Sequence, residues 1–367
     1  MNELTLSLTP SVPLHRQIEK KLRLQIESGL LQPGTPLPST SEFARQFGVH
    51  PLTLHKAMRR LKDEGLIVRT PRVGSFVSAN ATTSNIALIV GPDLKHETAR
   101  FHRSLVQELE RQSDSKWVMR IYDDFPTHHK EAPLGIDKLN AALGQDCGRI
   151  AFRGLLGVSI GYPPWQEVET LKGLPTAWFS VASAHSDLAL DHGDFVRSAV
   201  EYCAARGCRR LAYIPIVSDG VWEERHRKAF TDAAREKGIE EIITHNFCQF
   251  DLDGFLDEYI AYRWARKVVD GWQQDGWPDG VVVGDDLLTR SVAMALQHVN
   301  SPNIKRPLLF TWANDTIRLR YGMPVVRYNI PVKECARQLH EVLELRMGGR
   351  DPAEKQVRIR GAVEEEE

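Results

Sequence analysis

The sequence predicts an α/β protein in two parts: an N-terminal winged helix-turn-helix head and a two-lobed body of doubly wound parallel sheets. Two short helical patterns joined by a glycine turn and followed by two strand patterns lie in the first 78 residues. Beyond the small polar stretch "SANATTSN", buried apolar strands alternate with helices in two successive series. We therefore divide the chain into a head (1–78), a linker (79–85) and a body (86–367).

The second helix of the head is predicted over about 51 to 64. Its apolar residues recur at i, i+3, i+4 and i+7, which places them along one stripe of a helix. Pro51 suits a first helical position, and Gly65 suits a left-handed cap at the end. The stripe is Leu54, Ala57, Met58 and Leu61, and the opposite, basic face carries Thr53, His55, Lys56, Arg59 and Arg60.

The other elements of the head follow from similar signals. "STSEFARQFGV" offers a cap at Ser39 or Thr40, a helix with Phe43 and Phe47 four apart, and Gly48 to reverse the chain. "LIVRT" and "SFVS" predict a two-stranded wing around a turn at 71–74. An amphipathic helix, "LHRQIEKKLRLQIESG", and a Pro/Gly connector, "LQPGTPLPS", precede them.

The charge of the head favours nucleic acid as its partner. Residues 1–80 contain 11 Lys and Arg against 6 Asp and Glu, a balance of +5, whereas the rest of the chain carries −6. A small basic part on an acidic body is the electrostatic pattern of a nucleic-acid binder, although a solvated helix face is the alternative. We expect Thr53, His55 and Lys56 to reach base edges in the major groove. Phosphate contacts are expected from Arg59, Arg69 and Arg72.

Four motifs in this order also resemble a known family. "GLLQPGTPLPS", "EFARQFGV", "TLHKAMRRLKDEGLI" and "GSFV" are similar to the winged-helix DNA-binding domain of GntR-type bacterial regulators, over roughly 12 to 78. The resemblance implies double-stranded operator DNA as partner, with contacts at Ser39, Thr40, Ser41, His50 and Gly74. The chain departs from the family in two places: Thr40 and Ser41 replace a usual Glu-Arg, and His50 and Pro51 replace a usual Ser-Arg. These departures bear on the sequence of the operator and not on DNA binding itself.

Composition excludes several other classes. A chain of 367 residues that is 42% hydrophobic and 26% charged is typical of a globular protein with two or three domains. Its start lacks the pattern of a signal peptide, and no apolar run is long enough to span a bilayer, so we expect a cytoplasmic location without a membrane partner. Its 5 cysteines lack the paired spacing of a zinc site and are interpreted as reduced core thiols. No cofactor or metal is expected.

The body predicts two lobes. The first series has strands at "IALIVG", "WVMRIYD", "RIAFRG" and "TAWFSV", with helices near 98–112 and 134–144. The second has strands at "RLAYIPIV", "IITHNF", "GVVVGD" and "PLLFTWA", with helices at "FVRSAVEYCAARG" and "EERHRKAFTDAAREKG" and near 253–274 and 287–298. "PVVRYNI" and a helix at 332–347 close the chain. A ligand would bind between the lobes, near the carboxyl ends of the strands.

A second resemblance covers about 86 to 360. "LALDHGDFVRSAVEYCAARGCRRLAYI", "DGVVVGDDLLTRSVAMALQ" and "PVVRYNIPVKECARQLHEVLELRMGG" are similar to the effector domain of LacI/GalR regulators, itself similar to periplasmic sugar-binding proteins. This resemblance implies a homodimer whose small-molecule effector, a sugar or related polyol, resets the spacing of two DNA-binding heads. The chain is then a sequence-specific transcriptional regulator, with repression as the expected sense.

Effector contacts are expected at strand ends. Asp191 and Asp194 follow one strand and Asp285 and Asp286 another, where helix capping is an equally good explanation. His226 stands where the family has an arginine. Trp312 offers a ring for a sugar face, with a core position as the alternative. The remaining candidates are Asp93, His96 and Phe101 after the first strand, and Trp222 and Arg225 beside His226.

One motif in the sequence fits a pattern found in hydrolases. "GVSIG" fits the G-x-S-x-G nucleophile elbow with Ser159 as the nucleophile. The elbow needs a helix directly after the serine, and Pro163 and Pro164 oppose that helix. We therefore expect no enzyme, and two alternatives stay open: a DNA-tethered hydrolase built on the body, and an architectural DNA binder whose body only dimerises.

Overall fold

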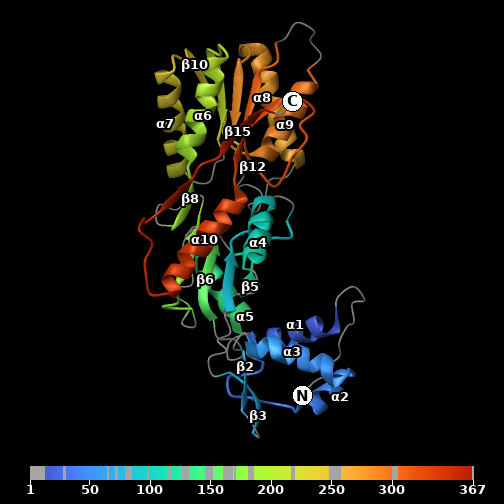
Figure 1. Cartoon of the computed structure of the whole chain (residues 1–367). Coiled ribbons are helices and arrows are strands. Elements are labelled where there is room, and N and C mark those ends of the chain that lie inside the picture. Colours follow the sequence, from blue (N-terminus) through green and yellow to red (C-terminus); the bar gives the residue numbers. More distant parts are fainter. Residues whose placement is uncertain are drawn as a thin grey trace.

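The computed structural model confirms the predicted fold class: a small head of helices with a wing, and a body of two α/β lobes. Figure 1 shows the head at one end of the molecule, beside the first lobe, with the second lobe at the far end. The structure describes residues 13–27, 30–63, 66–70, 73–78, 85–96, 99–113, 117–125, 132–144, 152–159, 168, 171–180, 186–215, 220–247, 258–299 and 305–365. The predicted linker, except Asn85, lies outside them.

The head is built around one apolar cluster. Its elements are α1 (Leu14–Glu27), β1 (Pro36–Leu37), α2 (Thr40–Phe47), α3 (Pro51–Asp63), β2 (Ile67–Thr70) and β3 (Gly74–Val77). The predicted stripe of α3 is buried, with Leu54, Ala57 and Leu61 at 0% exposure. It packs with Ile18, Leu22 and Ile26 of α1 and with the two phenylalanines of α2.

The caps of α2 follow the sequence signals. The Ser39 side chain accepts the Glu42 N–H and the Glu42 carboxylate accepts the Ser39 N–H, which completes a capping box. Gly48 ends the helix at φ 62°, a left-handed conformation that a Cβ would disfavour. This turn sets the angle between α2 and α3.

The sheet of the head differs from the prediction. It has three strands in the order β1-β3-β2, because the connector also forms a short strand. Pro36 and Leu37 pair with Phe76 and Ser75 of β3. Leu37 is buried in the head core, and Pro36, which has no N–H to donate, occupies an edge strand where none is needed.

The first lobe contains a six-stranded sheet of parallel strands in the order β14-β8-β7-β6-β4-β5. Helices α4 and α10 pack on one face and α5 on the other. Its elements are β4 (Asn85–Val90), α4 (Arg100–Gln112), β5 (Val118–Tyr122), α5 (Ala132–Gly144), β6 (Phe152–Val158), β7 (Thr176–Phe179), β8 (Leu188–Leu190), α10 (Val332–Met347) and β14 (Val357–Ile359).

The second lobe repeats this plan with a sheet in the order β10-β9-β11-β12-β13-β15, in which only β15 is antiparallel among the described strands. Helices α6 and α7 cover one face, and α8 and α9 the other. Its elements are α6 (His192–Ala205), β9 (Arg210–Ile214), α7 (Gly220–Glu236), β10 (Glu241–Thr244), α8 (Glu258–Asp275), β11 (Gly280–Val283), α9 (Asp286–Gln297), β12 (Leu308–Asn314), β13 (Val325–Ile330) and β15 (Ala362–Glu365).

The chain passes between the lobes after β8, β13 and β14 in the described part, and hydrogen bonds tie these crossings together. The Asp191 N–H donates to the Ile359 carbonyl at 2.8 Å. The Tyr328 hydroxyl donates to Asp194 Oδ2 at 2.6 Å and accepts the Gly361 N–H at 2.8 Å. All three crossings therefore meet in one hinge.

Among the described residues, no helix combines the length and the apolar character that crossing a membrane requires. No cluster of three or more metal-binding side chains occurs there either.

Candidate nucleic-acid interface and interlobe site

The basic face of α3 is open to solvent. His55, Lys56, Arg59 and Arg60 are exposed, and Thr53 is half-buried, while the apolar stripe faces the head core. The His50 Nδ1 accepts the Leu52 N–H at 3.3 Å, so this side chain caps the helix in addition to standing at its exposed start. The first turns of α3 thus present free donors and acceptors.

The wing is joined to the start of α2 by one arginine. Arg69, on β2, donates from Nη2 to Thr40 Oγ1 at 2.8 Å and from Nε to Ser75 Oγ at 3.3 Å. Two predicted DNA contacts, Thr40 and Arg69, therefore touch each other across 29 residues of sequence. The start of α2 and the wing form a single surface.

The other predicted DNA contacts are placed as follows. Ser39 and Ser41 are exposed at the start of α2, and Gly74 is exposed at the tip of the wing with φ 140°. Arg72 lies outside the described residues. The structure therefore gathers the start of α2 and the wing, and sets α3 beside them by packing in the common core.

In the second lobe of the body, aromatic rings from α6, α7 and β12 stack on one another. His226 of α7 stacks on His192 of α6, with ring centroids 3.5 Å apart and planes at 22°. His192 also lies 5.4 Å from the Trp312 ring at 24°, and its Nε2 is 3.1 Å from the Tyr213 hydroxyl. The predicted residues His226 and Trp312 are thus brought together by His192.

Both stacked histidines are uncharged at neutral pH. Burial, followed by the neighbouring charge of Arg225, lowers the pKa of His226 to about 4. Burial and the His226 ring lower the pKa of His192 well below its ordinary value. The position where the resembled family has an arginine therefore holds a neutral ring.

In the first lobe, a second group of side chains lies at the start of α4 and at the ends of β6 and β7. Phe101, at the start of α4, lies 5.7 Å from the Phe179 ring at the end of β7. Beside it, His102 Nε2 is 2.8 Å from Ser159 Oγ, at the end of β6. Ser159 adopts φ 52°, a left-handed conformation that costs a non-glycine residue about 1 kcal/mol or more. Burial, followed by the charge of Arg103, lowers the pKa of His102 to about 4.

A carboxyl group of the second lobe interacts with a positive charge of the first lobe. Burial and the adjacent Asp285 carboxylate raise the pKa of Asp286 to about 7, and the charges of Arg100 in α4 and Arg327 in β13 oppose this rise. The Asp285 carboxylate is used as the N-cap of α9, where it accepts the Leu288 N–H at 2.8 Å. The charge of Arg100 acts to lower the pKa of both carboxyl groups, so this arginine of the first lobe lies near the pair Asp285 and Asp286.

Arg327 is a buried cation of the second lobe, at 1% exposure. Its Nη2 donates to the Ile317 carbonyl at 2.6 Å, but its Nε and Nη1 have no hydrogen-bond partner within the described part of the chain. No carboxylate pairs with Arg327 within the described part of the chain. Its positive charge opposes the rise in the pKa of Asp286, which lies in the same lobe.

The remaining predicted effector residues lie elsewhere. Asp191 caps α6 by accepting the Asp194 N–H at 3.0 Å, as the capping alternative describes, whereas the Asp194 carboxylate accepts a hydrogen bond from the Tyr328 hydroxyl in the hinge. Asp93 and His96 form the turn between β4 and α4, where Asp93 Oδ1 accepts the Lys95 N–H. Arg225 is exposed on α7. Trp222 lies in α7, and its side chain is outside the described set.

Sequence reasoning missed Arg100, His102 and His192 as members of this site. His192 directly follows the strand-end Asp191, and this position at a carboxyl strand end was the available signal. Arg100 and His102 flank the predicted Phe101 in the first turn of α4. No sequence pattern links them to Asp286 or Ser159.

Comparisons with known proteins agree with this architecture. Residues 14–77 match the model of the family described as bacterial regulatory proteins, gntR family. The chain is 45% identical over 67 residues to the HTH-type transcriptional repressor NagR of Bacillus subtilis, which is 18% of this chain and 28% of that protein. It is 30% identical over 117 residues to the HTH-type transcriptional repressor YtrA of the same organism, covering 31% of this chain and 88% of YtrA.

The chain thus spans little more than a quarter of NagR. Its body has the fold of a solved periplasmic binding protein/LacI transcriptional regulator from Alkaliphilus metalliredigens complexed with D-xylulofuranose. The two structures superpose with a TM-score of 0.56 at 17% sequence identity, and the match covers 77% of this chain and 98% of the solved chain.

Proposed function

Because the chain belongs to the gntR family of bacterial regulatory proteins, we propose that it is a transcriptional regulator whose head binds operator DNA under the control of an effector held between the lobes of its body. The observation that carries the proposal is the joining, in one chain, of an exposed basic helix face with a two-lobed body in which a charge of one lobe acts on a carboxylate of the other.

The head supports sequence-specific binding to double-stranded DNA. Thr53, His55 and Lys56 stand in the first turns of an exposed helix, where a recognition helix contacts base edges. Arg69 connects the wing to α2, at the edge of the same surface. NagR and YtrA are named repressors, so we propose repression as the sense of regulation, exerted in the cytoplasm.

The body supports an uncharged, hydroxyl-rich effector, a sugar or related polyol. Stacked aromatic rings that are neutral at pH 7 bind the apolar face of a sugar and give no attraction to a phosphate. With a pKa of about 7, Asp286 accepts hydrogen bonds from hydroxyl groups as a carboxylate and also donates one as a carboxylic acid. The regulator from Alkaliphilus metalliredigens, of the same fold, is described in complex with a sugar, D-xylulofuranose.

Catalysis is not part of the proposal. A serine nucleophile needs a histidine base that is itself oriented by a third group. Within the described residues, the His102 Nδ1 has no partner, and a pKa of about 4 makes this ring a weak base at neutral pH. The pair instead holds the Ser159 hydroxyl at the end of β6. Hydrolysis of p-nitrophenyl acetate that disappears in Ser159→Ala would instead favour the hydrolase alternative.

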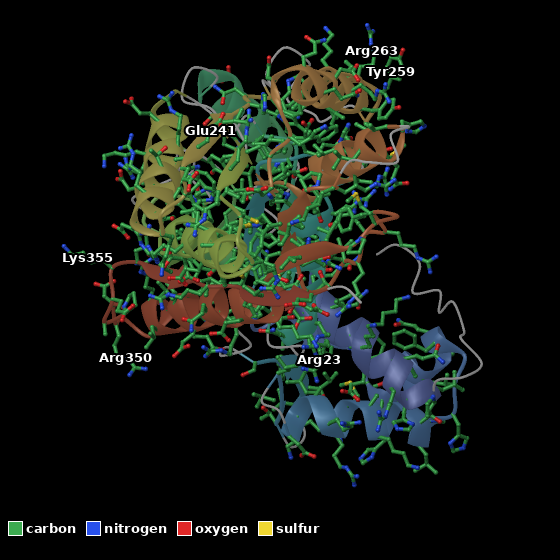
Figure 2. The ribbon with its side chains drawn as sticks, turned by 90° about the horizontal axis from the view of Figure 1, so that it is seen from above. Arg23, Glu241, Tyr259, Arg263, Arg350 and Lys355 are labelled. Atoms are coloured by element: carbon green, nitrogen blue, oxygen red, sulfur yellow. The ribbon has the colours of Figure 1, made fainter. Side chains whose placement is uncertain are left out.

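We also propose that the chain acts as a homodimer, since two heads bind two half-sites of an operator. Helices α8 and α9 pack together and carry Tyr259 at 67% exposure and Met294 at 42% exposure. Figure 2 shows Tyr259 and Arg263 on the outer surface of α8. Light scattering behind size-exclusion chromatography should give twice the mass of the chain.

A thermal-shift screen of the full chain against neutral sugars, polyols and sugar phosphates tests the effector proposal. A ligand at 100 times its Kd stabilises the folded state by about 2.7 kcal/mol. We expect a neutral compound to raise the Tm of the wild type but not that of Asp286→Asn, with Asp270→Asn, on the exposed side of α8, behaving as wild type. A screen in which only phosphorylated sugars bind would overturn the neutral class, and one without any binder would favour the purely dimerising body.

A further inference from the structure

Two cysteines meet at the C-terminal end of α6. The Cys208 N–H donates to the Cys203 carbonyl at 3.1 Å, and the Gly207 N–H donates to the Ala204 carbonyl at 3.0 Å. Gly207 has φ 79°. Together these are the bonds of a Schellman motif, in which the side chains at the positions of Cys203 and Cys208 face each other.

This motif fixes the backbone at a spacing that suits a disulfide. The 3.1 Å hydrogen bond and standard bond lengths limit the Cα–Cα separation of the pair to about 7 Å at most. Disulfides span about 4.4–6.8 Å between Cα atoms. Each thiol also alters the pKa of the other, as is expected of neighbouring sulfur atoms.

The surroundings leave room for this sulfur pair. Gly280, at the start of β11, lies against it, and a Cβ at this position would be 3.2 Å from the Cys203 sulfur and 3.6 Å from the Cys208 sulfur. Cys203 is fully buried, whereas Cys208 retains 6% exposure. Cys208 is therefore the thiol that a small reagent reaches first.

The charges favour Cys208 as the reactive member. The hydrogen bond from Cys203 and the charges of Lys305 and Arg206 lower the pKa of the Cys208 thiol, against burial and the charge of Asp279. The same hydrogen bond and burial raise the pKa of Cys203 well above its ordinary value. A thiol with a lowered pKa beside one with a raised pKa is the arrangement of an attacking and a resolving cysteine.

We propose that Cys203 and Cys208 are a site of oxidative modification, at which hydrogen peroxide converts the two thiols into an intramolecular disulfide. The Cys208 thiolate attacks one peroxide oxygen, so the O–O bond breaks, hydroxide leaves and a sulfenic acid forms. The Cys203 sulfur then attacks the Cys208 sulfur, the S–O bond breaks, and the hydroxyl leaves as water with the Cys203 proton. Two thiols are oxidised and one peroxide is reduced to two waters.

The disulfide would join the last turn of α6 to the residues before β9. Helix α6 begins at His192, which stacks on His226, so the cysteine pair and this ring stack lie at opposite ends of one helix. The inference does not depend on the proposed function, because it concerns the thiol chemistry of the folded chain alone.

The test uses the full chain carrying Cys147→Ser and Cys248→Ser, which leaves three cysteines. After brief exposure to hydrogen peroxide and quenching, remaining thiols are alkylated and the intact mass is measured. We expect a loss of two hydrogens, restoration by dithiothreitol, and one alkylated cysteine after unfolding, Cys335. Cys335 is the internal control, since it is fully buried and burial raises its pKa to about 12.

Two variants make the result specific. Cys203→Ala should lose the disulfide and accumulate a sulfenic acid at Cys208 that dimedone labels, at least tenfold more than Cys335 is labelled. Cys208→Ser should lose both products. If peroxide leaves both thiols free at doses that oxidise glutathione completely, or if Cys335 reacts as fast as Cys208, the proposal is overturned.

Discussion

Replacing Lys56 and replacing Arg69 should weaken DNA binding in different ways. Lys56 is exposed in the second turn of α3, and no hydrogen bond or ion pair with another described residue holds its side chain. Arg69 is half-buried and is already bound to Thr40 and Ser75, so its guanidinium is held where the wing meets the start of α2. Lys56→Ala should remove sequence information, and Arg69→Ala should remove attraction common to all DNA.

The magnitudes follow from these two roles. A lost base contact costs about 1–3 kcal/mol, which is roughly 5- to 150-fold in affinity for the operator, and random DNA should lose only a few-fold. Loss of one phosphate contact reduces the slope of log K against log[salt] by about 0.9. Arg69→Ala should show this smaller slope on operator and random DNA alike.

Gel shifts at several salt concentrations measure both quantities, with an operator selected from a random-sequence library. Lys62→Ala is the matched control, because this lysine is exposed in the last turn of the same helix. If Lys56→Ala and Arg69→Ala changed the ratio of operator to random affinity by the same factor, the division of roles would be refuted.

Three further predictions concern stability. Leu54→Ala should destabilise the head by about 2–5 kcal/mol, whereas Leu52→Ala, at 65% exposure on the same helix, should change the unfolding free energy by less than about 0.5 kcal/mol; circular dichroism measures both. Because the folded pKa of Asp286 is about 7 against 3.8 unfolded, the wild type should lose stability as pH rises from about 4 to about 7, by at most about 4 kcal/mol. Asp286→Asn should remove this loss in thermal melts, and an equal pH slope in both proteins would count against the buried carboxylate. Folding lowers the pKa values of His192 and His226, so the free energy of unfolding should fall as the pH drops from about 6.5 towards 4. His226→Gln should reduce this fall. A wild-type Tm that stays constant over this range would contradict the neutral state of the two stacked rings.

The elements of the chain were predictable where local signals are strong. The stripe of α3 and the Ser39–Glu42 capping box are patterns within a few residues, and the structure confirms both. Strand β1 was not predicted, because its two residues pair only through the distant strand β3. Strands β14 and β15 were missed for a similar reason, since each is short and exists only as an addition to the edge of a sheet.

The site was predictable only in part. The ends of apolar strands pointed to Asp286 and Trp312, because parallel strands bring their carboxyl ends to one edge. His192 and His226 stack although they belong to different helices, and Arg100 acts on Asp286 from the other lobe. Neither interaction corresponds to a regular spacing in the sequence. For Asp191 and Asp194 the sequence left capping and ligand binding open, and their observed partners are backbone and hinge groups.

The most direct test of the account is the affinity of the full chain for its selected operator with and without the compound that gives the largest thermal shift. Fluorescence anisotropy at fixed salt measures this affinity. A coupling of about 1–3 kcal/mol between the two sites predicts a change of roughly 5- to 150-fold at saturating effector. An operator affinity that stays the same while the effector is fully bound would contradict the claim that the body controls the head.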